Sequence, residues 1–174
     1  MKFLNLDIRR ARPRAINTVF KKHFGDKQVV GAEIGVWKGE NAREMLKLLN
    51  LKCLFLVDAY RDYDGYNRID QDDFSKIEAI AKKNLKGFNN IAWINDYSFY
   101  KTLDFPLDFV YIDGNHSYEY VKADIENYFP KVKEGGIIAG DDIETEGVAK
   151  AVLEFANNHC LALRIAGRSW YIIK

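Results

Sequence analysis

The chain has 174 residues, a length that suits one compact domain. Hydrophobic residues make up 48% and charged residues 29% of the sequence, a mixture that buries a core, keeps a polar surface and excludes extensive disorder. The formal net charge of +1 gives no global field that would draw the protein to nucleic acid or to an anionic membrane, and no apolar run is long enough to span a bilayer.

Apolar runs alternate with helical patterns along the chain. Pro13 is placed to open a first helix, whose apolar stripe runs from Ala15 to Phe24, and Gly25 is placed to end it. Further helices are predicted at 41–49, from about 71 to 85, at 118–129 before Pro130, and at 148–158. Buried strands are predicted at 29–35, 53–58, 91–95, 107–113 and 135–142. This alternation predicts an α/β domain with a parallel sheet and right-handed crossovers.

The end of the chain has a different pattern. Two strand-like segments, 161–166 and 169–174, are joined only by Gly167 and Arg168. So short a connection predicts a hairpin, and hence two antiparallel strands added to the sheet. A plain dinucleotide-binding Rossmann domain does not usually end in this way.

Charge and cysteine are unevenly placed. A basic cluster occupies the first 22 residues, and we interpret it as a solvated helix face; its members are Lys2, Arg9, Arg10, Arg12, Arg14, Lys21 and Lys22. Cys53 and Cys160 lie in apolar surroundings without a metal or redox motif, so we expect two buried free thiols. The first residues lack the apolar core of a secretory signal, and we expect a cytoplasmic protein.

The first strand leads into a turn that reads Glu33-Ile34-Gly35-Val36-Trp37-Lys38-Gly39. Glycines at positions 35 and 39 let the backbone approach a ligand closely, and the amides that open the next helix favour an anionic group. The spacing differs from the G-x-G-x-x-G of dinucleotide-binding proteins, which argues against nicotinamide redox chemistry. A glycine pair after a strand is also compatible with a simple turn.

Polar residues follow the second and third strands. Asp58 stands about 20 positions after the glycine turn, where an acidic residue commonly binds ribose hydroxyls; the alternative is an exposed aspartate at a strand end. Asn95, Asp96, Tyr97 and Ser98 end the third strand, where such architectures face adenine, or else form an Asx-type turn.

These segments together resemble a known family. AEIGVWKGENAREML followed by LVDAY is similar to motifs I and II of class I S-adenosylmethionine (SAM)-dependent methyltransferases. The segment LDFVYIDGNHSYEYVKADIENYFPKVKEGGIIAGDDI is similar to the later motifs of the macrocin O-methyltransferase-like subgroup, which includes other small-molecule and sugar methyltransferases. The likeness runs from about Val29 to the C-terminus.

The resemblance implies a single Rossmann-like domain over 1–174, with helices on both faces and strand order 3-2-1-4-5-7-6, strand 7 antiparallel. It implies that Glu33, Gly35 and the amides after Gly39 hold the methionine part of SAM, with Asn41 in range and Trp37 as a wall of the pocket. It further implies that Asp58 binds the ribose and that Asp96 and Ser98 flank the adenine.

Three carboxylates are expected to converge beside the sulfonium, from Asp113 after the fourth strand and Asp141 and Asp142 after the fifth. Like charges this close need a counter-charge, and no lysine or arginine occurs in these motifs. Hard oxygen ligands suit Mg²⁺, which related enzymes hold at corresponding positions, so we predict a divalent cation there. The alternative is that Asp142 caps a turn and Asp113 binds backbone amides.

His116 follows Asp113 by three residues and is our candidate general base, as in the macrocin-like group, with Asp113 beside it as the second catalytic candidate. We interpret Tyr118 and Asp124 as structural residues. Many relatives carry a longer N-terminal lid or auxiliary helices, whereas here we expect the loop at 59–73 to face the substrate, with Tyr60, Tyr63 and Tyr66 as candidate stacking surfaces for a sugar. The alternative is a mobile solvated loop.

We therefore expect methyl transfer from SAM to a hydroxyl, or else an amine, of a small acceptor such as a sugar. Two other interpretations stay open: a non-catalytic SAM-binding partner protein, and a SAM-fold enzyme of different chemistry such as aminopropyl transfer. An N/D-P-P-Y/F motif for attack on a nucleobase is absent from the sequence, which argues against a nucleic-acid partner. The sequence leaves the oligomeric state open, a homo-oligomer included.

Overall fold

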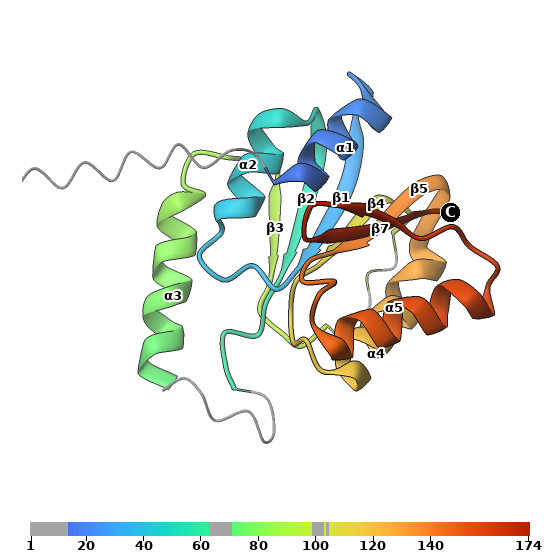
Figure 1. Cartoon of the computed structure of the whole chain (residues 1–174). Coiled ribbons are helices and arrows are strands. Elements are labelled where there is room, and N and C mark those ends of the chain that lie inside the picture. Colours follow the sequence, from blue (N-terminus) through green and yellow to red (C-terminus); the bar gives the residue numbers. More distant parts are fainter. Residues whose placement is uncertain (1–13, 63–70, 99–102, 104) are drawn as a thin grey trace, which may run out of the picture.

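The computed structural model describes residues 14–62, 71–98, 103 and 105–174. Five α-helices lie in this part of the chain: α1 (Ala15–Phe24), α2 (Glu40–Leu48), α3 (Gln71–Asn84), α4 (Tyr118–Tyr128) and α5 (Glu146–Asn158), with a 3₁₀ turn η1 (Phe129–Lys131) after α4. The strands are β1 (Val29–Ile34), β2 (Leu51–Val57), β3 (Ile91–Ile94), β4 (Leu107–Ile112), β5 (Val132–Gly140), β6 (Arg164–Ala166) and β7 (Ser169–Ile173) (Figure 1). Among the described residues, no helix combines the length and apolarity needed to cross a membrane.

The described strands form one seven-stranded sheet with the order β3-β2-β1-β4-β5-β7-β6. The pairs from β3 to β5 are parallel, and β7 pairs antiparallel with both β5 and β6. This confirms the predicted fold class, strand order and terminal hairpin. From β1 the strand order runs outward to β2 and β3 on one side, and then to β4 and β5 on the other side. The direction of the strand order therefore reverses at β1. Open α/β sheets bind ligands at such a switch point, outside the carboxyl ends of the strands.

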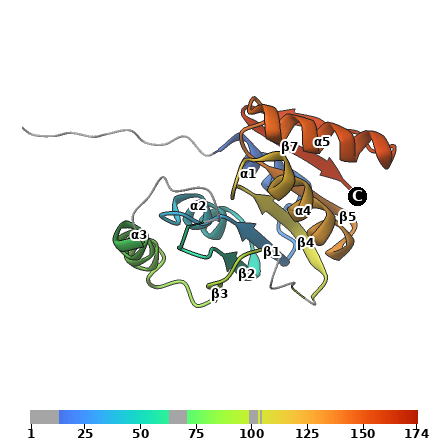
Figure 2. The same cartoon turned by 90° about the horizontal axis from the view of Figure 1, so that it is seen from below.

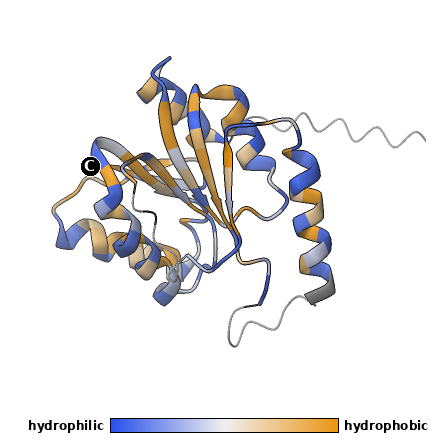
Figure 3. Ribbon diagram, turned by 180° about the vertical axis from the view of Figure 1, so that it is seen from behind, coloured by the Kyte–Doolittle hydropathy of each residue, from blue (hydrophilic) through white to orange (hydrophobic). Residues whose placement is uncertain are grey.

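Two helical layers cover the sheet, one on each face (Figures 1 and 2). Helices α1, α2 and α3 pack on one face, where Phe20 and Met45 lie against strand residues such as Leu54 and Phe109. Helices α4 and α5 pack on the other, where Ile125 lies in a cluster with Ile138 and Trp170. The central strands are largely hydrophobic, whereas the helices mix hydrophobic and hydrophilic residues (Figure 3). Strand residues contribute to a core cluster on each face of the sheet. This is the pattern expected for a parallel sheet buried on both sides.

Several predicted boundaries move by one to three residues. β5 begins at Val132 rather than at 135, because the strand starts ahead of its apolar run and includes the exposed Lys133 and Glu134. β6 comprises only Arg164–Ala166, so the predicted strand at 161–166 is shorter than expected. The α-helix before Pro130 ends at Tyr128, and Pro130 itself lies in the 3₁₀ turn.

The two cysteines are free, as predicted, but the expectation that both are buried is wrong. Cys53 is partly buried on β2, whereas Cys160 is exposed. Cys160 follows the end of α5 with a φ of 53°, in the left-handed region where a helix commonly ends.

Candidate active site at the carboxyl ends of the strands

The turn after β1 is held tightly against the loop after β4. Gly35 has a φ of 84°, and a Cβ atom on it would lie 2.2 Å from the backbone oxygen of Asp113. Gly39, with a φ of 73°, precedes α2, and its amide donates to the carbonyl of Val36. A side chain at position 35 would therefore force β1 and β4 apart at the edge where ligands bind.

Asp58, at the end of β2, accepts three backbone hydrogen bonds. Its Oδ2 accepts from the amides of Val36 and Trp37 at 2.8 and 2.9 Å, and its Oδ1 accepts from the amide of Tyr60 at 2.9 Å. Burial raises the pKa of Asp58, and the three backbone donors oppose that rise. Asp58, the residue predicted to bind the ribose, therefore also shapes the glycine turn.

A buried polar chain runs from α1 to β1. Asn17 Nδ2 donates to Asn41 Oδ1 at 2.9 Å, and Asn41 Nδ2 donates to Glu33 Oε1 at 2.8 Å. Glu33 is 1% exposed, and its Oε2 has no hydrogen-bond partner among the described residues. Burial raises the pKa of Glu33 to about 8, against the lowering effect of Asn41. The orphaned carboxyl oxygen marks a place that a cationic or hydrogen-bonding group would satisfy.

A cavity of about 290 Å³ opens beside this carboxyl group. It brings together several of the predicted cofactor residues with both catalytic candidates, and its lining comprises Arg14, Glu33, Gly35, Val36, Trp37, Lys38, Glu40, Asn41, Asp113, Gly114 and His116. Trp37 lines it with a φ of 53° and is 46% exposed. Gly39, Asp58, Asp96 and Ser98 do not line this cavity.

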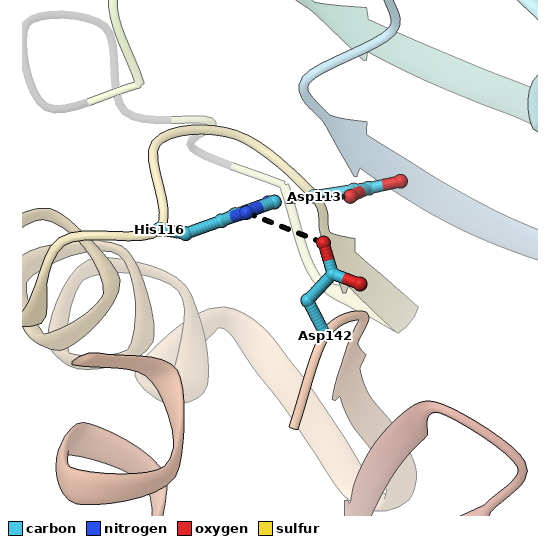
Figure 4. Close-up of side chains that lie close together, drawn as sticks. All are labelled: Asp113, His116 and Asp142. Atoms are coloured by element: carbon cyan, nitrogen blue, oxygen red, sulfur yellow. Dashed lines mark ion pairs between the residues drawn. The ribbon is translucent and has the colours of Figure 1, made fainter. Parts of the chain in front are cut away.

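The imidazole of His116 lies between two carboxylates, Asp113 after β4 and Asp142 after β5 (Figure 4). His116 Nδ1 is 3.3 Å from Asp142 Oδ2, and Nε2 is 3.6 Å from Asp113 Oδ1. The Asp113 carboxylate raises the pKa of His116, against the lowering effect of burial. Ligand atoms of the three side chains lie within 4.8 Å of one another, so this trio could hold a metal ion.

Asp141 lies in a different set of contacts. Arg14 Nη1 donates to Asp141 Oδ2 at 2.8 Å, to Asp113 Oδ2 at 2.7 Å and to the Tyr111 hydroxyl at 2.8 Å. The other oxygen of Asp141 accepts from the Ser169 hydroxyl at 3.1 Å. The structure thus brings His116, rather than Asp141, together with Asp113 and Asp142.

Two arginines supply the counter-charge that the local motifs lack. Arg14 bridges Asp113 and Asp141, and Arg168, from the turn between β6 and β7, pairs with Asp142 and Glu144. The local motifs contain no lysine or arginine, and the counter-charge comes instead from segments that are distant in the sequence. The interpretation of the N-terminal basic cluster as a solvated face is wrong for Arg14. Nearby negative groups raise the pKa of Arg14 although burial opposes them.

The residues expected at the adenine have other partners. Asp96 pairs with Arg61 at 2.9 Å, and Arg61 lies 4.6 Å over the ring of Tyr97. The Ser98 hydroxyl donates to the buried carboxyl of Asp124, a contact that ties the loop after β3 to α4. Tyr60 is 5% exposed and donates to the carbonyl of Trp37, so its predicted role as an exposed stacking surface is wrong.

Most of the predicted substrate-facing loop, including Tyr63 and Tyr66, lies outside the described residues.

Sequence reasoning missed Arg14, Asn17 and Arg168. Arg14 is 99 residues from Asp113 and 127 from Asp141, so no local motif contains the pair. The hairpin prediction placed Arg168 in a tight turn but gave no indication of where that turn points. Asn17 interrupts the apolar stripe of α1 and is fully buried. A polar residue on a buried helix face was the one available signal for it.

Residues 32–143 match the model of a family described as a methyltransferase domain. Among solved structures, the chain is similar to the O-methyltransferase NovP, with a TM-score of 0.63 and 16% identity over 92% of this chain and 76% of that one. It is also similar to CalS11, a TDP-rhamnose 3'-O-methyltransferase of calicheamicin biosynthesis, with a TM-score of 0.61 and 15% identity over 91% and 77% of the two chains.

A third similar structure is SMU.1697c of Streptococcus mutans, described as a candidate methyltransferase and solved in complex with S-adenosylhomocysteine (SAH). Its TM-score is 0.67, at 14% identity over 92% of this chain and 96% of that one. A search of curated proteins by sequence found no match. At these identities, the structural matches establish the shared fold.

Proposed function

The chain belongs to the methyltransferase domain family, and from this premise we propose that it transfers a methyl group from SAM to a hydroxyl oxygen of a small acceptor. One observation carries the proposal. A single cavity is lined by the residues proposed to bind the methionine part of SAM, Glu33 and Asn41, and by the residues proposed to act on the acceptor, Asp113 and His116. Methyl transfer needs its two substrates in contact, and a shared cavity meets that requirement.

Cofactor binding is assigned to the β1 and β2 side of the cavity. SAM, when bound, supplies an electrophilic methyl group on a positively charged sulfur. Glu33 has an unsatisfied buried oxygen that would accept from the amino group of the cofactor, and the positive charge of that group would favour the ionised carboxylate. Asp58 has three of about four acceptor sites filled by backbone amides, which leaves one for a ribose hydroxyl.

Acceptor chemistry is assigned to the β4 and β5 side. His116 would accept the proton of the acceptor hydroxyl as the oxygen–methyl bond forms and the sulfur–methyl bond breaks, which leaves neutral SAH and a protonated imidazole. Asp113 and Asp142 flank the ring on its two nitrogen sides and would stabilise the imidazolium. The cofactor methyl and the base would then lie at one cavity, which is the arrangement that in-line transfer requires.

The same trio fits a divalent cation. His116 Nε2 is buried without a hydrogen-bond partner among the described residues, and Asp113 and Asp142 each offer an oxygen. Two carboxylates and an imidazole suit Mn²⁺ better than Mg²⁺, because Mg²⁺ prefers oxygen ligands alone. A cation held there would lower the pKa of a bound acceptor hydroxyl. The nitrogen of His116 that bound the cation would not be free to accept a proton, so chelation separates the two roles.

The acceptor class is supported by two of the similar structures. NovP is an O-methyltransferase, and CalS11 methylates a sugar hydroxyl. A hydroxyl acceptor also agrees with a general base of histidine type, because a hydroxyl must lose its proton whereas an amine attacks as its free base. We propose a hydroxylated small molecule, with sugars as the first compounds to screen.

The proposal is tested in two stages. Calorimetric titration should show SAH binding by the wild type and by His116→Asn, since His116 is assigned to the acceptor side. Methyl transfer to a competent acceptor should fall by about 10²-fold or more in His116→Asn, the typical contribution of a general base. Binding of SAH without transfer to any acceptor would instead favour a non-catalytic SAM-binding protein.

Assays after chelation, in preparations shown to be metal-free, then distinguish the two roles of His116. Activity that survives chelation supports the role of His116 as a general base. Activity that is lost on chelation and restored by Mn²⁺ supports the role of His116 as a metal ligand.

A further inference from the structure

The proposed function leaves one prominent set of contacts in the site unexplained, the hydrogen bonds of the Arg14 guanidinium. Its Nη1 lies within 2.7–2.8 Å of three oxygens, which belong to Tyr111, Asp113 and Asp141. These oxygens come from β4, from the loop after β4 and from the loop after β5. Three oxygens from separate places converge on one positively charged nitrogen, in the way that protein oxygens converge on a bound cation.

The backbone of Arg14 is anchored at both its amide and its carbonyl group. Its backbone amide donates to Glu44 Oε2 of α2 at 3.2 Å, and its carbonyl accepts from the amide of Asn17 at 2.9 Å. The helix that follows is fixed to the sheet by Phe20, which is fully buried with its ring centroid 4.6 Å from that of Phe109. The guanidinium is therefore held in place by the packing of α1.

The contacts of Arg14 divide the carboxylates into two groups. Asp113 Oδ2 faces Arg14, whereas its Oδ1 faces His116. Asp141 has one oxygen on Arg14 and the other on Ser169, and it is not part of the trio that could hold a metal. Each carboxylate oxygen that faces the guanidinium is one that a cation in the trio would otherwise attract.

We propose that Arg14 is a resident cation of this site, which keeps Asp141 away from the metal-binding trio and weakens the binding of a divalent ion there. Removal of the guanidinium frees Asp141 Oδ2 and Asp113 Oδ2 together. The variant site would then offer three carboxylates and one imidazole, with one positive charge fewer beside them. The inference concerns the acceptor side of the proposed function, but its test measures metal binding and needs neither SAM nor an acceptor.

The test is a titration of the full chain with Mn²⁺, in which electron paramagnetic resonance measures the concentration of the free ion and hence the affinity. Arg14→Gln should bind Mn²⁺ about ten-fold or more tightly than the wild type, because two close negative groups lose their counter-charge. Arg14→Lys keeps the charge and should remain near the wild type. An Arg14→Gln affinity equal to that of the wild type would overturn the proposal.

Lys21→Gln is the matched control for the loss of one charge. Lys21 lies on α1 with the same 39% side-chain exposure as Arg14, but it pairs with Asp26. Its replacement should leave Mn²⁺ affinity unchanged. A gain equal to that of Arg14→Gln would show a general field effect and count against a specific role for Arg14.

Asp141→Asn completes a double-mutant cycle and guards against misfolding of the arginine variant. In the otherwise wild-type chain it should change Mn²⁺ affinity by less than about two-fold, because Arg14 already occupies Asp141. In the Arg14→Gln background it should remove most of the gain. A large loss in the wild-type background would show that Asp141 is already a ligand, and this would overturn the proposal even if Arg14→Gln failed to fold.

SAH titration of the same variants separates this inference from the proposed function. Normal SAH binding with no effect of Arg14 on Mn²⁺ rejects the role of Arg14 alone. Absence of SAH binding in a folded wild type rejects the proposed function, and the Mn²⁺ result stands independently of it.

Discussion

Asp58 holds the turn after β1 in place through three backbone hydrogen bonds, two of them to consecutive amides of that turn. The carboxylate is therefore a structural centre of the proposed cofactor site as well as a candidate ligand. Loss of the side chain removes both effects together. Substitution of Asp58 should therefore weaken cofactor binding more than substitution of a residue that only contacts ribose.

We predict that Asp58→Ala weakens SAH binding by about 1–3 kcal/mol, through loss of charge-assisted bonds to the ribose and of the bonds that shape the turn. Calorimetric titration measures the first effect, and the free energy of unfolding measures the second. Asp26→Ala is the control, because Asp26 is exposed, pairs with Lys21 and has no assigned place in the cofactor site. Wild-type SAH affinity in a folded Asp58→Ala would contradict the ribose assignment.

Asp124 is buried beside Ser98, and burial raises its pKa to about 7. The folded state therefore keeps a proton on Asp124 at pH values where the unfolded chain, with a pKa near 3.8, has lost it. The folded state binds more protons over this window, so the contribution of Asp124 to stability falls as pH rises from about 4 to about 7.

Asp124→Asn removes this titration and keeps an acceptor for the Ser98 hydroxyl. We predict that the free energy of unfolding of the variant, measured relative to that of the wild type, rises by about 2 kcal/mol from pH 5 to pH 8. Urea unfolding at the two pH values measures the difference. The exposed Asp73→Asn on α3 is the control for a lost charge, and an equal trend in both variants would refute the buried origin of the effect.

At the scale of elements, the contact between the turn after β1 and the loop after β4 sets the geometry of the cavity. Gly35 combines a positive φ with a carbonyl only 2.2 Å from the place of a Cβ atom. We predict that Gly35→Ala lowers the free energy of unfolding by about 2–4 kcal/mol and weakens SAH binding, because both the backbone conformation and the space oppose a side chain.

Gly87→Ala is the matched control for this prediction. Gly87 also has a positive φ, of 100°, but no atom lies within 4 Å of the place that a Cβ atom would take. Its substitution should cost only the backbone preference, about 1–2 kcal/mol, and leave SAH binding intact. Chemical unfolding of the two variants separates strain from steric conflict; equal losses would show that the close approach of β1 and β4 contributes nothing.

Elements with a clear apolar pattern, either a helical stripe or a continuous buried run, were predictable in place, whereas elements with mixed patterns were displaced at their ends. The stripe on α1 placed that helix correctly, because its apolar residues repeat at helical spacing. The start of β5 was missed because Lys133 and Glu134 are polar residues in a strand. β6 is exposed over most of its length, so apolar residues before it extended the prediction into the preceding segment.

At the scale of the whole molecule, the strand order came from the family resemblance rather than from periodicity, since periodicity alone does not order parallel strands. The residues of the glycine turn and the loop after β4 were predictable because each stands at a strand end. Arg14 was not, because its partners depend on how α1 packs across the sheet. Tertiary contacts over 99 and 127 residues leave no local signal in the sequence.

The domain as a whole should be stabilised by its cofactor product. At a SAH concentration of 100 times the dissociation constant, the gain is about 2.7 kcal/mol, which raises the midpoint of thermal unfolding by about 5–10 °C for a chain of this size. NAD at the same concentration is the control, because the turn lacks the dinucleotide spacing of glycines. A shift with NAD and none with SAH, in a thermal scan, would reverse the cofactor assignment.

The two edges of the sheet are β3 and β6, which comprise four and three residues. An edge strand presents unpaired amides and carbonyls to which another chain can add, and a long, flat, apolar edge is a template for aggregation. Here both edges are short, and β6 carries the exposed Arg164. Within the described part of the chain, edges this short offer little backbone for pairing with another chain. The folded protein should therefore resist growth into cross-β aggregates at high concentration, and copies that associate would do so through side chains.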